Sequence, residues 1–191
     1  MTRDMKAILT LLTAQVVLCA LALAGVAYGK ASAVRRVLDS MPVHVTDKGE
    51  APEKRGARLD AISAAIEGAT QVPIERAALL VLARRESGLA AYVFEHRCSD
   101  GPRGERECDS GKAKGVFQLQ PNRMHPEIPA DVASQAKIAI AAWRYGMHRC
   151  SHSVPDDIAG AFDSYGSGGG CAPTEQGKSR AAETRAYAGR L

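Results

Sequence analysis

Glu86 is the residue whose type and position could do acid–base chemistry; it lies in the string RRESG at residues 84–88. A glutamate carboxyl group can donate a proton in catalysis when an apolar surrounding keeps it protonated near neutral pH. A solvated glutamate, or one paired with Arg85, would have the same local sequence. The choice between these interpretations depends on the motifs that follow Glu86.

Three further motifs follow Glu86 in order along the chain. Residues 115–121 read GVFQLQP, residues 161–168 read AFDSYGSG, and residues 185–187 read RAY. Tyr165 and Tyr187 could each be an ordinary half-buried core residue with a satisfied hydroxyl. Four motifs in a fixed order indicate a shared site far more strongly than any one of them.

Together these segments resemble the lytic transglycosylase and goose-type lysozyme families. Those families have Glu-Ser at a helix end, a Gly-Leu-Met-Gln-like segment, Ala-x-x-Tyr-Asn or a close variant, and a tyrosine in the last helix. The resemblance covers roughly residues 59–191. It implies a single lysozyme-like domain that is all-α or mostly helical.

The resemblance also implies a role for each matching residue. Glu86 would be the catalytic acid, and Ser87 would help to position the substrate. Tyr165 would lie beside Glu86, and Tyr187 would close onto it from the last helix. Four residues would form the floor of the cleft near the reacting sugar: Gly115, Val116, Phe117 and Gln118.

The chain departs from the family pattern at three positions. Val116 and Phe117 stand where Leu and Met are usual, which is a tolerable change of volume in an apolar floor. Gly166 follows Tyr165 where many members have Asn, so one side-chain contact to the sugar is missing. The floor and the orientation of the substrate are therefore expected to differ in detail.

Cleavage of a β-1,4 glycosidic bond normally uses two carboxylates, and a second one is hard to find here. Asp100, Asp109 and Asp163 are each more simply solvated or capping residues. In the family that the chain resembles, one glutamate protonates the bond between N-acetylmuramic acid and N-acetylglucosamine. It then takes the proton of the sugar's own six-hydroxyl, which gives a 1,6-anhydro product without any cofactor or metal.

This mechanism requires Glu86 to be protonated near neutral pH, and we expect Val116, Phe117 and neighbouring aliphatic residues to supply the apolar surrounding. Arg85 would oppose it if its side chain pointed inward. Two alternatives stay open. One is a hydrolytic goose-type lysozyme that uses water, and the other is a catalytically silent glycan-binding or assembly module.

The elements that must position these motifs are predicted to be helices. Apolar residues at three- and four-residue steps predict a helix over 57–68, and Pro73 begins a helix that ends near Gly88. Further helices are expected over 130–147, 156–164 and 179–190, and a polar loop over 96–114. No convincing strand pair is present.

Length, composition and charge predict one ordinary globular domain. The chain has 191 residues, of which 46% are hydrophobic, 24% charged and 5% aromatic, and it carries a net charge of +4. Basic and acidic residues are interleaved, so nucleic acid is not an expected partner. The histidines lack a ligand spacing and the cysteines lack a Cys-x-x-Cys pair, so no metal site is expected.

Residues 1–29 are expected to be a signal peptide or a membrane anchor, because Arg3 and Lys6 precede an apolar run over 7–27. Residues 30–56 are interpreted as a linker, and residues 57–191 as the catalytic domain. The protein is then exported to the periplasm or cell envelope, and a retained segment would be its only contact with the membrane. Peptidoglycan strands are the expected partner, within general wall turnover or a secretion, conjugation or phage apparatus.

Four cysteines follow the export segment, an even number that indicates disulfides in an oxidising compartment. Three pairings are possible on paper. The local solution joins Cys98 to Cys108 and Cys150 to Cys171, each pair closing a loop that can bend back on itself.

Overall fold

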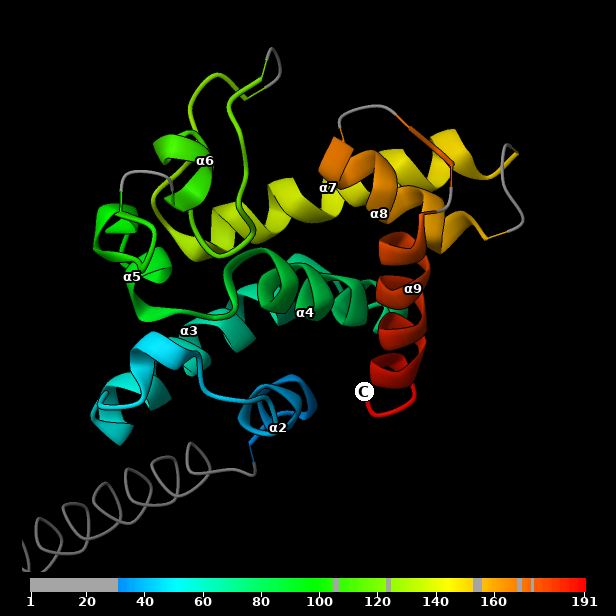
Figure 1. Cartoon of the computed structure of the whole chain (residues 1–191). Helices are drawn as coiled ribbons and strands as arrows, with labels where there is room; N and C mark the ends of the chain where they lie inside the picture. Colours follow the sequence, from blue (N-terminus) through cyan, green and yellow to red (C-terminus); the bar gives the residue numbers. More distant parts are fainter. Residues whose placement is uncertain (1–30, 105–106, 123–124, 153–155, 168–169, 173) are drawn as a thin grey trace, which may run out of the picture. The chain divides into compact units, whose positions relative to one another are not determined.

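Helix α4 (Pro73–Ser87) carries Glu86 in its last turn, and the middle of the helix is buried around its whole circumference. Every residue from Ala77 to Ala83 is 0% exposed in the computed structural model. A helix that is apolar on all sides must be surrounded by other elements. Figure 1 shows α4 in the middle of the helices, in contact with α2, α3, α7 and α9.

The structure describes residues 31–191 except 105–106, 123–124, 153–155, 168–169 and 173. Residues 1–30, which carry the expected export segment, lie outside the described residues. Besides α4, the described elements are α2 (Ala33–Asp39), η1 (Val45–Asp47), α3 (Pro52–Ala69), α5 (Ala91–Phe94), η2 (Cys98–Asp100), α6 (Glu107–Gly111), α7 (Val132–Cys150), α8 (Asp157–Ser167) and α9 (Glu175–Ala188). These residues contain no strand, which confirms the all-α prediction.

The ends of the helices follow the local sequence. Pro52 and Pro73 occupy the first turns of α3 and α4, where a missing N–H has no consequence. Asp131 accepts a hydrogen bond from the N–H of Ser134 at 2.7 Å and so caps α7. Helix α3 begins five residues before the predicted start and continues through Gly68, since its tertiary contacts outweigh the low helix propensity of glycine.

Residues 33–50 contradict the expectation of a linker without regular structure. Val34, Val37, Leu38 and Met41 are at most 5% exposed and belong to the main hydrophobic core. Their spacing of three and four residues makes one apolar face, although over too short a stretch to stand out in the sequence. The unit of described structure therefore begins at Ala33 and not at residue 57.

Disulfides join Cys98 to Cys108 and Cys150 to Cys171, as the local pairing predicted. The first connects η2 with α6 within a small apolar cluster that also contains Tyr92. The second connects the end of α7 with the segment after α8. Two disulfides indicate an oxidising environment outside the cytoplasm.

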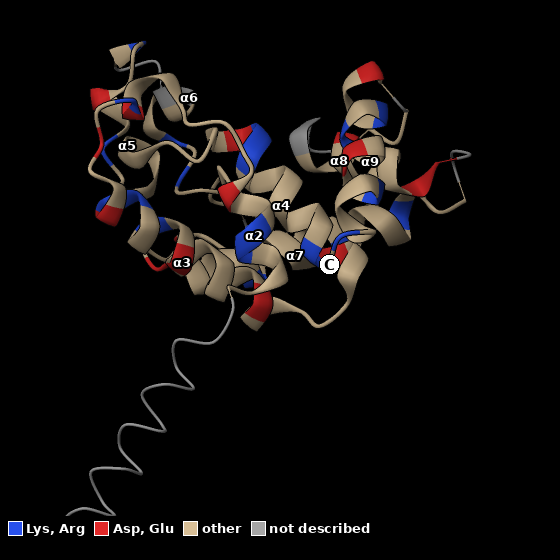
Figure 2. Cartoon of the chain, turned by 90° about the horizontal axis from the view of Figure 1, so that it is seen from below, with Lys and Arg blue, Asp and Glu red and all other residues tan. Residues whose placement is uncertain are grey.

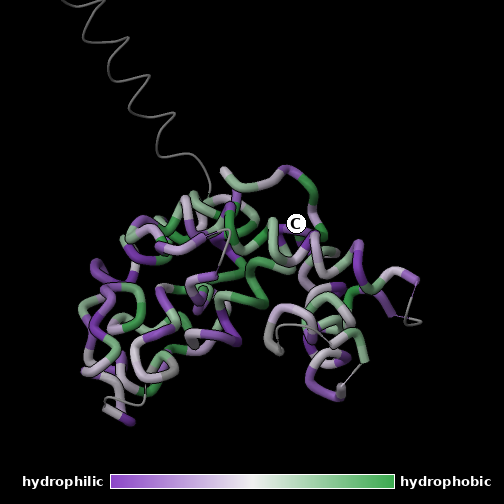
Figure 3. Tube along the Cα trace, turned by 90° about the horizontal axis from the view of Figure 1, so that it is seen from above, coloured by the Kyte–Doolittle hydropathy of each residue, from purple (hydrophilic) through white to green (hydrophobic). Residues whose placement is uncertain are grey.

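Hydrophobic and charged residues are distributed as in a water-exposed domain. In Figure 3 hydrophobic stretches run through the interior of the trace, and hydrophilic stretches lie mostly at its periphery. Basic and acidic segments are interspersed over the face seen in Figure 2. Within the described part of the chain, no helix is both long and apolar enough to cross a membrane.

Candidate active site

The end of α4 fixes where Glu86 lies. Gly88 has a left-handed backbone (φ 60°, ψ 14°), and its N–H donates to the carbonyl of Arg84 at 2.9 Å. Leu89 is also left-handed, at φ 58°. A Cβ atom at Gly88 would lie 2.7 Å from Cδ2 of His44, so glycine is required by both conformation and space. The chain therefore turns sharply two residues after Glu86.

The carboxyl group of Glu86 contacts a cation that was not predicted from the sequence. Its Oε1 lies 2.7 Å from Nη1 of Arg180 on α9, and the two side chains are 21% and 8% exposed. This is an ion pair without good hydrogen-bond geometry. The immediate surrounding of the Glu86 carboxyl group therefore includes a positive charge and is not wholly apolar.

Arg84 and Arg85, the neighbours of Glu86 in sequence, contact a different carboxylate. Both guanidinium groups pair with Glu183 of α9, with Nε of Arg85 at 2.8 Å. Burial raises the pKa of Glu183, but the hydrogen bonds from Tyr187 and Arg85 and the two positive charges outweigh it and lower the pKa overall. Arg85 is thus held on α9 by Glu183.

Tyr165 connects two of the sequence motifs and lies within electrostatic reach of the third. Its hydroxyl donates a hydrogen bond to the carbonyl oxygen of Phe117 at 2.8 Å. Burial raises the pKa of Tyr165, and the negative charge of Glu86 raises it further against the opposing effect of Arg180. The hydroxyl is therefore neutral at physiological pH, and the charges of Glu86 and Arg180 act on it in opposite directions.

Gly115 and Gln118 shape a tight turn between α6 and α7. The N–H of Gln118 donates to the carbonyl of Gly115 at 3.0 Å, and Lys114 pairs with Leu119 through two backbone hydrogen bonds. Gly115 has φ 64°, and a Cβ atom there would lie 1.9 Å from Oε1 of Gln135. The glycine of this motif is therefore required by the turn and by the buried glutamine beneath it.

Three of the predicted substrate-binding side chains are engaged within the protein. Val116 and Phe117 are 1% and 0% exposed and belong to the main core. Their side chains pack in the core under the turn, so they are not accessible to a sugar. Ser87 donates its hydroxyl to the carbonyl of Ala83 at 2.7 Å and accepts from the N–H of Leu89 at 3.1 Å. Its hydroxyl thus links the last turn of α4 to the residue after the turn.

Gln118 and Tyr187 keep part of their side chains accessible, but each has partners other than Glu86. The amide of Gln118 donates to the carbonyl of Gly115 at 3.0 Å. The hydroxyl of Tyr187 accepts a hydrogen bond from Nη1 of Arg84 at 3.0 Å. Burial and the hydrogen bond to Glu183 raise the pKa of Tyr187. Tyr187 thus contacts the Arg84–Glu183 pair beside the candidate acid.

Two of the three aspartates considered as a second carboxylate have structural partners. Asp163 accepts hydrogen bonds from the N–H of Thr174 at 2.8 Å and from its hydroxyl at 2.6 Å, which joins α8 to the start of α9. Asp100 forms an exposed ion pair with Arg97. The side chain of Asp109 lies outside the described residues.

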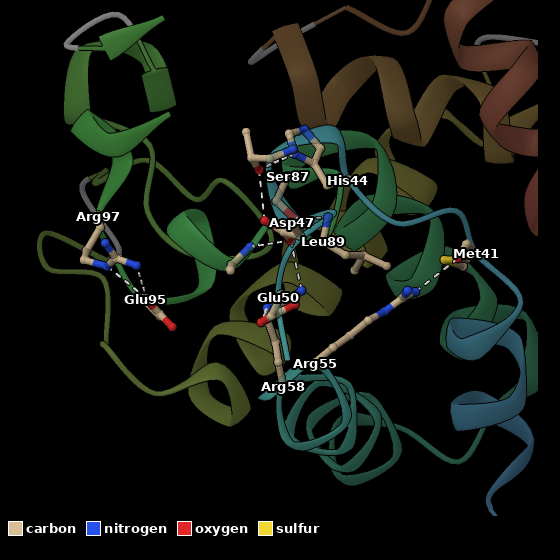
Figure 4. Close-up of polar contacts among 12 residues, drawn as sticks. Met41, His44, Asp47, Glu50, Arg55, Arg58, Ser87, Leu89, Glu95 and Arg97 are labelled. Carbon is tan, nitrogen blue, oxygen red and sulfur yellow. Dashed lines mark hydrogen bonds and ion pairs between the residues drawn. The ribbon is translucent and has the colours of Figure 1, made fainter. Parts of the chain in front are cut away.

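A buried polar network supports the turn after α4 (Figure 4). Oδ2 of Asp47 accepts from Nη2 of Arg58 and from the N–H of Ala91, both at 2.9 Å. Asp47 and Arg58 are each 6% exposed, and Glu50 also pairs with Arg58. The sequence does not indicate this network, because residues 30–56 show no sustained period and Asp47 and Glu50 look like surface residues of a linker.

Arg180 could have been found from helical periodicity. It precedes Tyr187 by seven residues, so the two side chains share a face of α9 after two turns. If this face packs along α4, Arg180 contacts α4 about 10 Å along the axis of α9 from Tyr187. The pairing with Glu86 itself depends on how α9 rotates against α4, which the sequence pattern does not specify.

Comparison with known proteins gave no match: no family model, curated protein or solved structure resembles the chain significantly. A resemblance to any known family therefore depends on the four sequence motifs alone.

Proposed function

We propose that this protein is an exported peptidoglycan lytic transglycosylase. It cleaves the β-1,4 bond between N-acetylmuramic acid and N-acetylglucosamine, with Glu86 as its single general acid and base. The observation that carries the proposal is the position of Tyr165. Its hydroxyl binds the backbone of Phe117 and interacts electrostatically with Glu86, so three motifs that are distant in sequence meet at one place.

The reaction needs one side chain that first donates a proton and then accepts one, and Glu86 takes both roles. The protonated carboxyl group gives its proton to the bridging oxygen, and the bond from that oxygen to the anomeric carbon breaks. The substrate's own N-acetyl group stabilises the resulting cation. The carboxylate then accepts the proton of the six-hydroxyl, whose oxygen bonds to the anomeric carbon and closes the 1,6-anhydro ring. The structural engagement of Asp163 supports a mechanism with a single carboxylate.

The proposed substrate agrees with the environment that the disulfides indicate. Peptidoglycan lies outside the cytoplasmic membrane, where Cys98–Cys108 and Cys150–Cys171 can form. We therefore propose the periplasm or cell envelope as the site of action. No cofactor or metal takes part in the proposed reaction.

Digestion of purified peptidoglycan followed by product mass tests the proposal. We expect fragments with 1,6-anhydro ends, and we expect E86Q to abolish their formation. E175Q is the matched control, because Glu175 is 90% exposed on α9. Products that carry an added water would instead identify a hydrolytic goose-type lysozyme. Equal activity in E86Q and the wild type would exclude Glu86 as the acid.

The ion pair of Glu86 with Arg180 favours one alternative, a catalytically silent glycan-binding module. A carboxyl group that is engaged by a buried guanidinium within the protein is less available to contact a glycosidic oxygen. This alternative predicts that the wild-type protein sediments with purified peptidoglycan but releases no soluble fragments. Release of anhydro fragments by the wild type would exclude it.

A further inference from the structure

We propose that the exposed face of α7 is a second surface for peptidoglycan, separate from the surroundings of Glu86. It binds the intact polymer through the carboxylates and the sugar rings that the polymer carries. Because this polymer is the substrate named in the proposed function, the inference rests on that function. We call the surface the α7 face, and it consists of Lys137, Ala141, Tyr145, His148 and Arg149.

Helix α7 differs from the other described helices in its charge. Its 19 residues include Lys137, Arg144 and Arg149 but no aspartate or glutamate. Of the helices in the described part of the chain, it is the only one that has basic residues without acidic ones. Asp131 precedes the helix as its N-cap, where it accepts a hydrogen bond from the N–H of Ser134. The positive charge of α7 is therefore not balanced within the helix.

Two of the three cations on α7 have no ion-pair partner among the described residues. Nε and Nη2 of Arg144 bind the two carboxylate oxygens of Glu75 on α4, at 2.8 and 2.6 Å. Lys137 and Arg149 are exposed, and neither forms an ion pair with a described acid. Lys137 lies close enough to Asp131 to affect it electrostatically, but the two form no ion pair. Both cations of the α7 face can thus contact an anionic partner.

The α7 face lies opposite the buried side of the helix, which contains Trp143. Residues four apart lie side by side on a helix, so one stripe contains every fourth residue from Lys137 to Arg149. At a rise of about 1.5 Å per residue, this stripe is about 18 Å long. Tyr145 is 61% exposed and lies within the stripe, next to the small side chain of Ala141. An extended polymer can therefore contact the tyrosine ring and both cations together.

The chemistry of the α7 face fits a sugar polymer that carries carboxylates. Peptidoglycan has carboxyl groups on its peptide stems, and lysine and arginine can pair with them. Its sugar rings have apolar faces that can pack on an exposed aromatic ring whose hydroxyl stays in water. Tyr145 supplies such a ring between the two cations.

A lipid surface fits the α7 face less well. A helix that binds a membrane surface inserts a large apolar face, but the apolar side of α7 is already buried in the core. Along α7, whose residues are all described, Tyr145 is the only large apolar side chain that is exposed. The observations therefore favour the glycan polymer as the partner.

The α7 face lies away from Glu86. Arg144, the neighbour of Tyr145 in sequence, binds Glu75 in the first turn of α4, whereas Glu86 is in the last turn. The two glutamates are separated by about 16 Å along the axis of α4. A strand on the α7 face would therefore hold the protein on the polymer without occupying the site at Glu86.

Sedimentation with purified, insoluble peptidoglycan tests the surface. Each protein also carries E86Q, so that the polymer stays intact during the measurement. Y145A removes the aromatic ring and Y145F keeps it. K137E/R149E reverses both charges, and K48E/K54E makes the same change of net charge at two exposed lysines outside α7.

We expect Y145A to weaken binding by about fivefold and K137E/R149E by about tenfold or more. Y145F and K48E/K54E should bind as the parent protein does. Binding of K137E/R149E equal to that of K48E/K54E would overturn the proposal. Binding to phosphatidylglycerol vesicles but not to peptidoglycan would overturn it as well, because it would identify a lipid surface as the partner.

Activity measurements with Glu86 intact separate this surface from the proposed function. K137E/R149E should release fewer anhydro fragments from insoluble peptidoglycan and as many as the wild type from short soluble glycan fragments. An equal loss on both substrates would overturn the separate role of the α7 face. The proposed function fails by a different result, namely no anhydro products from the wild type on either substrate, whatever the sedimentation shows.

Discussion

The hydroxyl of Tyr165 donates a hydrogen bond to the carbonyl oxygen of Phe117 across 48 residues of sequence. This contact joins α8 to the turn over 115–118. The residue that accepts the hydrogen bond, Phe117, has a fully buried side chain. The position of the turn therefore depends on the tyrosine hydroxyl. Any role of the turn in binding a glycan depends on the same contact.

Y165F should destabilise the protein by about 1–3 kcal/mol, because the carbonyl of Phe117 loses its donor in a partly buried place. Urea unfolding measures the change. The control is Y145F, since Tyr145 is 61% exposed and the same hydroxyl is removed on the surface. Equal stability of the two variants would show that the hydroxyl of Tyr165 does not hold the turn.

Glu183 should make the stability of the protein depend on pH in the acidic range. Its pKa is lowered from 4.5 in the folded state, because the hydrogen bonds and charges of Tyr187, Arg85 and Arg84 outweigh burial. A group with a lowered folded pKa stabilises the protein above its unfolded value, and this contribution is lost as the pH falls. The wild type should therefore lose stability below about pH 4.5.

E183Q cannot make that contribution, so it should be less stable than the wild type at pH 7 and should lose less on acidification. Unfolding in guanidinium chloride at a series of pH values measures both effects. E175Q, which changes an exposed glutamate of the same helix, is the control. If E183Q and the wild type lost equal stability between pH 7 and pH 3, the ion pairs of Glu183 would have no role in acid sensitivity.

G115A should cost more than about 2 kcal/mol, because it adds a steric clash to an unfavourable backbone conformation. The new Cβ atom would lie 1.9 Å from Oε1 of Gln135 at a residue with φ 64°. Gly104 offers a matched control with φ 57° and no atom within 4 Å of the added Cβ. G104A should therefore show the backbone cost alone, about 1 kcal/mol. A thermal unfolding midpoint of G115A no lower than that of G104A would contradict the clash.

Much of the fold follows from local sequence patterns. Pro73, the apolar run after it and Gly88 together specify α4 and its end, and therefore the place of Glu86 in its last turn. The two disulfides follow from the proximity of Cys98 to Cys108 and of Cys150 to Cys171 along the chain. These features depend on contacts between residues that are close in sequence, and such contacts can be predicted from periodicity and spacing.

The missed features depend on contacts between distant segments. Helix α2 has seven residues, too few for a clear apolar period, and its place in the core is set by α3 and α4. The pairing of Arg180 with Glu86 depends on the rotation of α9 against α4. The burial of Val116 and Phe117 likewise depends on what lies beneath the turn, which composition alone does not indicate.

D47N should be among the most destabilising single changes, because it removes one of the two carboxylates that pair with the buried guanidinium of Arg58. Oδ2 of Asp47 lies 2.9 Å from Nη2 of Arg58, with side-chain exposures of 4% and 5%. Removing one partner of a buried pair costs about 3–5 kcal/mol, and the retained pairing of Glu50 with Arg58 places the loss at the lower end. Asp39, which is 48% exposed and pairs with Arg35, provides the control variant D39N, expected to cost less than about 1 kcal/mol.

The double variant D47N/R58M separates loss of charge balance from loss of packing. If the cost of D47N comes from the guanidinium that has lost one of its two carboxylates, removing that group as well should restore part of the stability. The double variant should then lose less than the sum of the two single variants. Urea unfolding of the four proteins gives this interaction energy. Strict additivity would show that Asp47 acts mainly through its hydrogen bond to the N–H of Ala91, which holds the chain just after the turn that follows Glu86.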